Sequence, residues 1–598
     1  MTEPASRLEP EEPASAAPSA ERRRRGLPAL PSHPRLVAGL LVLLAALLGT
    51  SMIDESPTTD EPLHLTRGLA YYWGPDASLS YQHPPLGNAF AALPVALTAP
   101  SVDMGSLEGY AKGETWTVAR ALLAPHYGKR RPWFFEARVM MALLCVALAY
   151  YVYRLGVKLY GPAVGLWALL FFALHPTLIA HGRLDTTDMP VTVAMVIATG
   201  ELVFYLLGGS RRHGLLAAVA VGAGLVTKYT GVAMVPLASL AVLLTAAFGL
   251  GRYRELPRVR ALAEAGVFLL LSAAIALFVI NAAYRFEGSG LTAGEMLSLP
   301  EPAPDEPKGF GGEVLERASI LPKLPPGLPI PLPYTYVFGL SVLRAHGGDG
   351  HATAFFGEPM RHGHPAYFPV MLLIKTPLAL MFGLGAALLV AVRRRGRLSL
   401  ASWLLSGYAA LLVLMATRGS INIGVRHVLP MIPIMCLFGG LGVVHLMRAS
   451  DPEKARRFAI GVVAACVGGV IWSFPDYLSD FNLLVGGRAG GQRISIVGEE
   501  WGQDTWRLGR ALRQRGIPEV YFSGDSFTSR LELRRQQVGQ LKFGCPKVLP
   551  SNAYVAIQAR DIAREGDTCA RWTRGRTPLF DIHGHVFVYR TGPNEQPF

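Results

Sequence analysis

The sequence predicts an all-α polytopic membrane protein of about eleven transmembrane helices, with large extramembrane loops and a small C-terminal α/β domain. Hydrophobic residues make up 51% of its 598 residues and charged residues only 17%, whereas soluble domains carry about a quarter charged residues. The apolar residues form blocks such as 36–53 and 163–180, each about long enough to cross a bilayer. These blocks must be helical, because lipid offers the backbone no other hydrogen-bond partners.

The apolar blocks place a membrane domain over residues 35–474. The stretch 214–248 is too long for one straight span, so we interpret it as two short helices that turn near Lys228. Residues 1–34 are rich in Pro, Ala, Ser and Glu and are predicted to be a disordered cytoplasmic tail. The predicted helices lie near 35–53, 135–157, 161–180, 189–208, 214–227, 230–248, 263–283, 366–392, 398–417, 428–447 and 458–474.

The positive charge of the chain is divided among short arginine clusters between alternate apolar blocks. The net charge is +14, and examples of the clusters are Arg22–Arg25, Arg211–Arg212 and Arg393–Arg397. The positive-inside rule places these clusters in the cytoplasm. A nucleic-acid partner is not expected, because nucleic-acid binding requires a basic face on a soluble fold.

With this orientation, three long segments lie on the non-cytoplasmic side: the loop 54–134, the loop 284–365 and the residues 475–598. A transporter usually has short loops, a midplane site and an internal repeat, and we find no convincing repeat. A lipid or polysaccharide flippase should carry charged residues inside its spans, and few are present. The chemistry is therefore expected at the outer membrane interface.

The C-terminal segment 475–598 is predicted to be a compact α/β domain, because a helix over 504–515 is followed by short β-type runs. Cys545 and Cys569 both lie in this segment, and an oxidising compartment favours a disulfide between them over two free thiols. The remaining cysteines lie in apolar spans and are expected to be small core residues: Cys145, Cys436 and Cys466.

An acidic pair, Asp60-Glu61, comes directly after the first predicted helix. A carboxylate at this boundary is suited to act as a general base on an acceptor hydroxyl if its pKa lies near the working pH. The alternative is that Asp60 caps a helix that starts at Glu61 with Pro62 in its first turn. Taken alone, the pattern favours capping, although one residue can serve both purposes.

A second acidic site lies in the short outer loop between the third and fourth helices. Asp185 and Asp188 are three residues apart and have Arg183 and His181 nearby. One carboxylate is expected to cap the following helix. The other would be free to hold substrate, a metal or a basic partner.

Basic residues also occur on the outer side, where the positive-inside rule makes them rare. Lys228 lies in the outer turn between two helices, and Arg426 and His427 follow Asn422 in the outer loop before the tenth helix. A guanidinium matches phosphate oxygens in a bidentate fork, which suggests a lipid phosphate as the ligand. The alternative is contact with phospholipid headgroups. For Lys228, the phosphate-ligand and headgroup interpretations are evenly balanced. For Arg426, which has His427 beside it, the pattern favours a phosphate ligand over headgroup contact.

These motifs together resemble the GT-C superfamily of polyprenyl-phosphate-dependent glycosyltransferases. Within it they resemble the group of protein O-mannosyltransferases and aminoarabinose lipid A transferases, which is similar to glycosyltransferase family 39. The resemblance covers roughly residues 36–475. It is carried by Asp60-Glu61 and by four further stretches, namely His83 to Leu86, Arg183 to Asp188, Tyr367 to Pro369 with Lys375 to Pro377, and Asn422 to Pro430. The segment Glu500 to Asp504 is similar to a Trp-Gly-Gln-Asp motif of bacterial members, which place Asp where this chain has Glu500. We assign this segment no role.

The resemblance implies a multi-pass protein of the bacterial inner membrane with its active site on the outer face. Its donor would be a polyprenyl-phosphate sugar, its acceptor a hydroxyl of a protein or glycolipid, and its outcome inversion. It implies catalysis by Asp60 and Glu61; a phosphate site of Arg426, His427, Lys228 and Arg183; and substrate contacts at Asp185, Asp188, His83 and Asn422. Some relatives hold a divalent metal at the acidic pair, so the cofactor question stays open. A flippase and a whole-glycan ligase remain the alternative functions.

Overall fold

The computed structural model describes residues 34–302, 313–393, 398–524, 526–542, 551–563 and 568–593. The predicted disordered tail 1–34 therefore lies outside the described residues, apart from Pro34, which begins the first helix.

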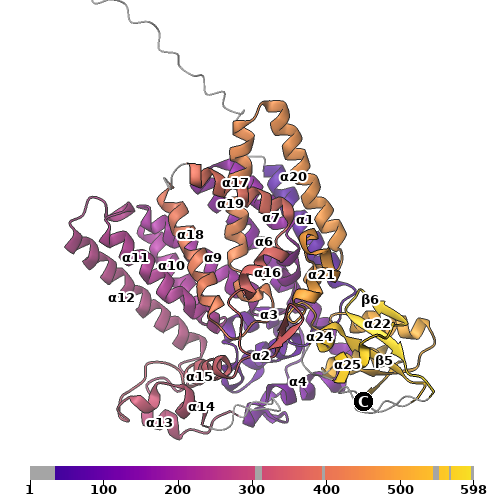
Figure 1. The fold of residues 1–598 in the computed structure, drawn as a ribbon. Helices are drawn as coiled ribbons and strands as arrows, with labels where there is room; N and C mark the ends of the chain where they lie inside the picture. The colour runs from indigo at the N-terminus through magenta and orange to yellow at the C-terminus, as the bar shows by residue number, and fades with distance from the viewer. Residues whose placement is uncertain are drawn as a thin grey trace, which may run out of the picture.

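The body of the molecule is a bundle of apolar helices (Figure 1). Among the described residues, eight helices are long and apolar enough to cross a membrane, or ten if two bent pairs each count as one span. The shorter α10 accounts for the remaining predicted segment, so the predicted bundle of apolar helices is confirmed. The bundle contains α1 (Pro34–Met52), α6 (Pro132–Tyr160), α7 (Pro162–Ala173), α8 (Pro176–Gly182), α9 (Asp188–Leu206), α10 (Arg211–Leu225), α11 (Met234–Ala247), α12 (Arg258–Ala283), α16 (Tyr367–Lys375), α17 (Leu378–Arg393), α18 (Leu400–Thr417), α19 (Met431–Ala449) and α20 (Pro452–Ser473).

Two of the spans are sharply bent. The pair α7–α8 turns by 65° and the pair α16–α17 by 114°. Pro176 and Pro377 follow the two breaks, and a proline cannot supply the amide that would continue the preceding helix. As a result, the polar ends of α8 and α16, which carry His181 and Lys375, are buried inside the protein.

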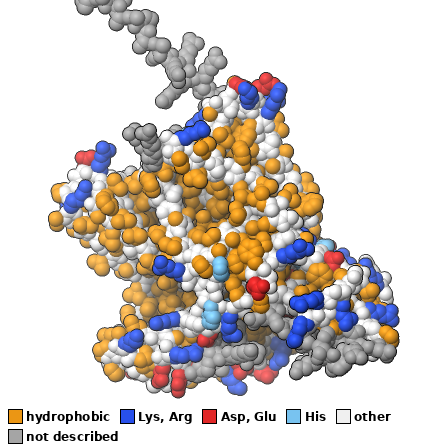
Figure 2. Space-filling model, viewed as in Figure 1, with side chains coloured by type: hydrophobic (Ala, Val, Ile, Leu, Met, Phe, Trp, Pro, Cys, Tyr) orange, Lys and Arg blue, Asp and Glu red, His pale blue; other side chains and the backbone are white. Residues whose placement is uncertain are grey.

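The long loops and the C-terminal segment lie at one end of the bundle (Figure 1). A broad band of hydrophobic side chains covers the middle of the visible face, and charged side chains gather at its two ends (Figure 2). The loops fold into α2 (Glu61–Trp73), α3 (Pro85–Thr98), α4 (Thr115–Leu123), α5 (Tyr127–Arg130), α13 (Ala293–Ser298), α14 (Val314–Ala318), α15 (Tyr334–Asp349), β1 (Thr353–Phe355) and β2 (Glu358–Met360).

The C-terminal segment contains a five-stranded sheet of order β4-β3-β5-β7-β6. Strand β3 pairs in parallel with β4 and β5, and β7 pairs antiparallel with β5 and β6. The predicted small α/β region is therefore present. Its elements are α21 (Gly487–Ile494), α22 (Thr505–Gln514), β3 (Glu519–Phe522), α23 (Phe527–Arg535), β4 (Gly539–Lys542), β5 (Tyr554–Gln558), α24 (Ala559–Ala563), α25 (Thr568–Thr573), β6 (Phe580–Ile582) and β7 (Val586–Arg590).

The cysteines divide into two groups. Cys145, Cys436 and Cys466 are free and buried, as expected of small core residues. Cys545 lies outside the described residues, so its disulfide with Cys569 stays a prediction.

Candidate active site

Asp60 lies at the water-facing start of α2, but it does not cap that helix with its side chain. Its carboxylate instead accepts a hydrogen bond from Nη1 of Arg426 at 3.1 Å, and 36% of the side chain is exposed. Desolvation raises the pKa of Asp60, but the Arg426 guanidinium and the nearby His64 together hold this pKa below its ordinary value. Asp60 is therefore ionised, and it is open to a reactant.

Arg426 lies in a short 3-10 turn, Val425–Val428, between α18 and α19. Its Nε donates to the carbonyl oxygen of Ile423 at 3.2 Å, and its guanidinium lies 4.0 Å from the ring centroid of Trp501. Only 12% of the side chain is exposed. Arg426 is thus held inside the protein, where it faces Asp60, and does not extend to a lipid headgroup.

A second ion pair joins the turn between α10 and α11 to the start of α9. Nζ of Lys228 donates to Oδ1 of Asp188 at 2.5 Å, and the two side chains are 11% and 2% exposed. Thr187 occupies the N-cap position of α9, and no side chain caps this helix. Asp188 also acts on the pKa of Asp60, raising it slightly, so the two ion pairs belong to one polar region.

Four histidines lie near these ion pairs: His64 and His181 are buried, and His83 and His427 are half-buried. Nδ1 of His64 lies 2.9 Å from Oδ1 of Asn88, and Nδ1 of His83 lies 3.3 Å from Oγ1 of Thr187. Nε2 of His427 and both ring nitrogens of His181 have no hydrogen-bond partner among the described residues. Burial lowers the pKa of His64 to about 4, and lowers those of His83 and His427 well below the ordinary value.

Neutral imidazoles can donate through one nitrogen and accept through the other. An unpaired polar atom is costly to bury, and such atoms in a native structure require an explanation. His427 directly follows Arg426 in the chain, and the ring of His181 lies 6.1 Å from that of Trp501, which also contacts Arg426. Unpaired nitrogens in these positions are suited to a polar or anionic ligand.

Glu61 has different surroundings from its neighbour Asp60. Its carboxylate accepts from Nε and Nη2 of Arg138, each at 2.6 Å, and from the amides of Thr58 at 2.6 Å and Asp185 at 3.1 Å. Its side chain has no exposed surface. Glu61 therefore connects α2 to α6 and to the loop before α9 through hydrogen bonds. Neither of its oxygens is free to bind a substrate.

Arg183 is likewise engaged elsewhere. Its guanidinium forms a bidentate pair with Glu55, with Nη2 donating to Oε1 at 2.6 Å, and its Nη1 also donates to the carbonyl oxygen of Ser51 at 3.1 Å. The predicted phosphate contact of Arg183 would require this buried pair to open.

Asp185 and Asn422 are buried with one oxygen each unpaired. Oδ2 of Asp185 and Oδ1 of Asn422 have no partner among the described residues. Burial, and then the nearby Glu61 carboxylate, raise the pKa of Asp185 well above its ordinary value. This direction favours the neutral form of the Asp185 carboxyl over the anionic form.

The residues do not fit a metal ion at the acidic pair. Both carboxylate oxygens of Glu61 already accept hydrogen bonds, and two of these bonds come from Arg138. Within the described part of the chain, the group of side chains spaced to hold a metal is Asp476, Asp504 and His583. We therefore derive no step at Asp60 through a metal.

Several residues of this region were missed by sequence reasoning. Arg138 falls inside a predicted span, where a charged residue implies a buried partner, and this signal identifies its pairing with a carboxylate. Glu55 and Trp501 carry no comparable signal, because their partners lie far away in the sequence.

The fold and these residues define a polytopic membrane protein with a cluster of paired charges at one end of its helix bundle, in which Asp60 is partly exposed. Residues 133–283, which contain Asp188 and Lys228, match the family model described as dolichyl-phosphate-mannose-protein mannosyltransferase. The resemblance to protein O-mannosyltransferases is thereby confirmed over that part of the chain.

Comparison with solved structures gives several similar folds. ArnT from Cupriavidus metallidurans in the apo state has 12% identity and a TM-score of 0.48, with 93% of this chain and 99% of ArnT covered. The archaeal oligosaccharyltransferase AglB from Archaeoglobus fulgidus, in complex with an inhibitory peptide and a dolichol-phosphate, has 11% identity and a TM-score of 0.46, with 89% of this chain and 72% of AglB covered. No curated protein matches the sequence.

Proposed function

We propose that this protein is a membrane glycosyltransferase that transfers a sugar from a polyprenyl-phosphate carrier to a hydroxyl of a protein or glycolipid acceptor. The observation that carries the proposal is the pairing of the partly exposed Asp60 with Arg426, beside the pair of Asp188 with Lys228. The mannosyltransferase family match over residues 133–283 supports the same reaction class.

Arg426 and Lys228 are the residues that we assign to the donor phosphate. Each is paired with a carboxylate in this structure, and a dianionic or monoanionic phosphate would compete for both cations. The unpaired Nε2 of His427 is a further donor in its neutral form. Because the Arg183 guanidinium is occupied by Glu55, we do not include it.

Asp60 is the residue that we assign as general base. Its low pKa makes it a weak base while Arg426 is its partner. When a phosphate draws Arg426 away, the pKa of Asp60 rises, so donor binding would activate the base. The acceptor oxygen then attacks the anomeric carbon, its proton passes to Asp60, and the bond from the anomeric carbon to the phosphate oxygen breaks.

The leaving group is the polyprenyl phosphate, which gains negative charge as that bond breaks. Arg426 and Lys228 stabilise this charge because they are already oriented toward the site. Attack from the face opposite the phosphate inverts the anomeric configuration.

The sidedness of the site is also part of the proposal: it faces outward from a bacterial inner membrane. Alkaline phosphatase fused after residue 475 should then be active, and fusions at Arg211 or Arg393 should be inactive. The reverse pattern would overturn this orientation.

The experiment that tests the function uses the purified full-length protein with a panel of polyprenyl-phosphate sugars, and it measures released polyprenyl phosphate. We expect release with at least one donor, and a loss of about 10²–10⁴ in rate for Asp60→Asn. An Asp60→Asn enzyme with wild-type rate would remove Asp60 from the mechanism. A flippase would release no polyprenyl phosphate from any donor. Gene deletion, with mass spectrometry of protein and lipid glycans, would identify the acceptor.

A further inference from the structure

The loop Glu499–Asp504 connects the membrane bundle to the C-terminal sheet, and its first residue is fixed in the bundle. Nζ of Lys375 donates to Oε2 of Glu499 at 2.8 Å, and both side chains are at most 1% exposed. Oε1 of Glu499 accepts from the amide of Val425 at 3.3 Å. Glu499 thus fixes the loop to the residue directly before Arg426.

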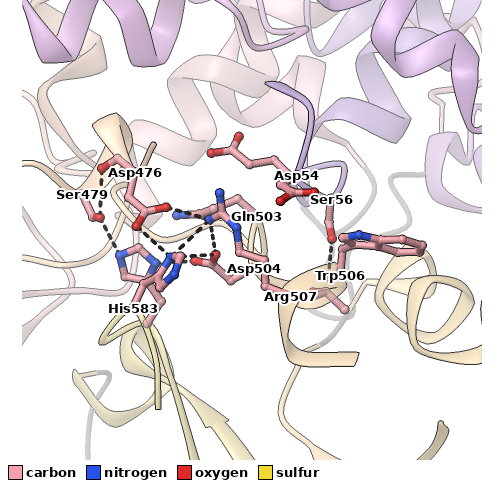
Figure 3. Close-up of polar contacts among 12 residues, drawn as sticks. Asp54, Ser56, Asp476, Ser479, Gln503, Asp504, Trp506, Arg507 and His583 are labelled. Carbon is pink, nitrogen blue, oxygen red and sulfur yellow. Dashed lines mark hydrogen bonds and ion pairs between the residues drawn. The ribbon is translucent and has the colours of Figure 1, made fainter. Parts of the chain in front are cut away.

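The last residue of the loop, Asp504, is fixed by a second buried network (Figure 3). Nη1 of Arg507 donates to Asp504 at 2.5 Å and to Asp476 at 2.6 Å, and His585 also bonds to Asp504. Asp476, Asp504 and His583 are spaced as metal ligands, but the guanidinium of Arg507 already bridges the two carboxylates. We therefore interpret this cluster as an anchor.

Between these two anchors, the loop is hydrogen-bonded to the residues that precede Asp60. The carbonyl oxygen of Trp501 accepts from the amide of Thr59 at 2.8 Å and from its hydroxyl at 3.1 Å. The carbonyl oxygen of Gln503 accepts from the amide of Ser56 at 3.0 Å. The backbone position of Asp60 is thus set by the loop.

The side chain of Trp501 sets the position of Arg426. The ring is 5% exposed, and the guanidinium of Arg426 lies 4.0 Å from its centroid, within the range of a cation–π interaction. The backbone of Trp501 therefore holds one half of the Asp60–Arg426 pair, and its ring holds the other half.

We propose that Trp501 is a positioning residue of the active site, which sets the relation of Asp60 to Arg426 and so lets one loop of the C-terminal region complete a site built on membrane helices. This inference rests on the proposed function for its catalytic meaning. It assigns a role to the segment Glu500 to Asp504, which sequence reasoning left without one.

The test compares three variants of the full-length protein. Trp501→Ala removes the ring but keeps the carbonyl oxygen, and Trp501→Phe restores an aromatic face. Trp572→Ala is the matched control, because Trp572 is also a buried residue of the C-terminal region with an arginine over its ring, Arg576 at 4.4 Å. It packs in a separate hydrophobic cluster of the sheet, with Val555, Ile557 and Tyr589.

Polyprenyl phosphate alone is the binding probe. Loss of the cation–π contact should weaken its binding by about three- to thirty-fold in Trp501→Ala, with much of the loss recovered in Trp501→Phe and little change in Trp572→Ala. Of the three variants, Trp501→Ala should move the acid limb of the rate–pH profile to higher pH, because Arg426 is then held less closely beside Asp60. Equal effects in Trp501→Ala and Trp572→Ala, or none in Trp501→Ala, would overturn the inference.

Amide hydrogen exchange of the ligand-free protein separates this inference from the proposed function. Exchange in segments 56–60 and 423–428 should be faster in Trp501→Ala than in the wild type and the Trp572→Ala control. This readout requires no donor, so it tests the positioning role even if no polyprenyl-phosphate sugar is a substrate. Unchanged exchange in both segments would contradict the positioning role.

Discussion

Asp60 and Glu61 are adjacent acidic residues, but they belong to two different regions of the molecule. Asp60 belongs to the mouth of the site, where its side chain is 36% exposed and bonds to one nitrogen of Arg426. Glu61 belongs to an inner layer, where it is fully buried and accepts from Arg138 and two amides. The difference teaches that two adjacent carboxylates of one motif can have different surroundings, since Asp60 keeps exposed surface and Glu61 has none.

The inner layer contains a second pair of the same kind, Arg183 with Glu55, in which both side chains are about 1% exposed. Fully paired charges of this type are strongly destabilising to break, because removal of one partner leaves an uncompensated buried charge. At the mouth, by contrast, water and ligands compete for the charged groups.

The largest effect that separates these regions is expected in stability. Glu61→Gln should lower the free energy of unfolding by about 3–5 kcal/mol, as the loss of one partner of a buried pair does. Asp60→Asn should lower it by less than about 1 kcal/mol, because a partly exposed pair contributes little. Thermal and denaturant unfolding in the same detergent would measure both. Equal losses of unfolding free energy in Glu61→Gln and Asp60→Asn would show that the two carboxylates do not differ in their contribution to stability.

A smaller effect is expected in binding at the mouth. Arg426→Ala should weaken polyprenyl phosphate binding by about 10–100-fold, since a hydrogen bond to a charged group contributes about 1.5–3 kcal/mol. Arg426→Lys should recover part of this loss, because lysine keeps the charge without the fork geometry.

Arg488→Ala is the control for this binding measurement, because Arg488 is also paired with an aspartate, Asp476, at 3.3 Å. It should bind polyprenyl phosphate as tightly as the wild type. If Arg426→Ala did the same, Arg426 would have no part in phosphate binding.

The smallest effect is expected in pH dependence. The pKa of Asp60 in the folded protein is below its ordinary value of about 3.9. The contribution of this carboxylate to stability is therefore fully present above the unfolded pKa, and it is lost as the pH falls through the folded pKa. The unfolding midpoint should show no loss from Asp60 between pH 7 and about pH 5. In Arg426→Ala, the acid limb of the rate–pH profile should move to higher pH, and an unmoved limb would show that Arg426 does not control the ionisation of Asp60.

The helices of the bundle are predictable from the sequence because lipid imposes length and apolar composition on each span. The bends are visible in outline, since Pro176 and Pro377 interrupt two apolar blocks, but their angles of 65° and 114° depend on packing. Strand β4, with the sequence Gly-Gln-Leu-Lys, lacks the β-branched residues that indicate a strand and was not predicted.

The site was predictable only as a set of residue types. The sequence predicts Lys228 and Arg426 to lie on the outer side, where basic residues are rare, so it identifies both as candidates. The pairing of each cation with its carboxylate depends on contacts between distant segments, which the sequence does not reveal. The expected capping roles of Asp60 and of one aspartate at the start of α9 do not occur. The different burial and pairing of Asp60 and Glu61 could not be predicted, because Arg138, the partner of Glu61, lies on a helix in another part of the sequence.

The hydrogen bonds from Thr59 to the carbonyl oxygen of Trp501 have a consequence for biosynthesis. Asp60 is made early and Trp501 late, so a nascent chain can insert all of its helices while its acidic residue is still without its loop partner. Chains fold progressively as they are synthesised, and this one acquires a complete site only when its final region folds back onto its first loop. We expect a truncated product that ends before residue 500 to insert into the membrane but to lack the proposed activity.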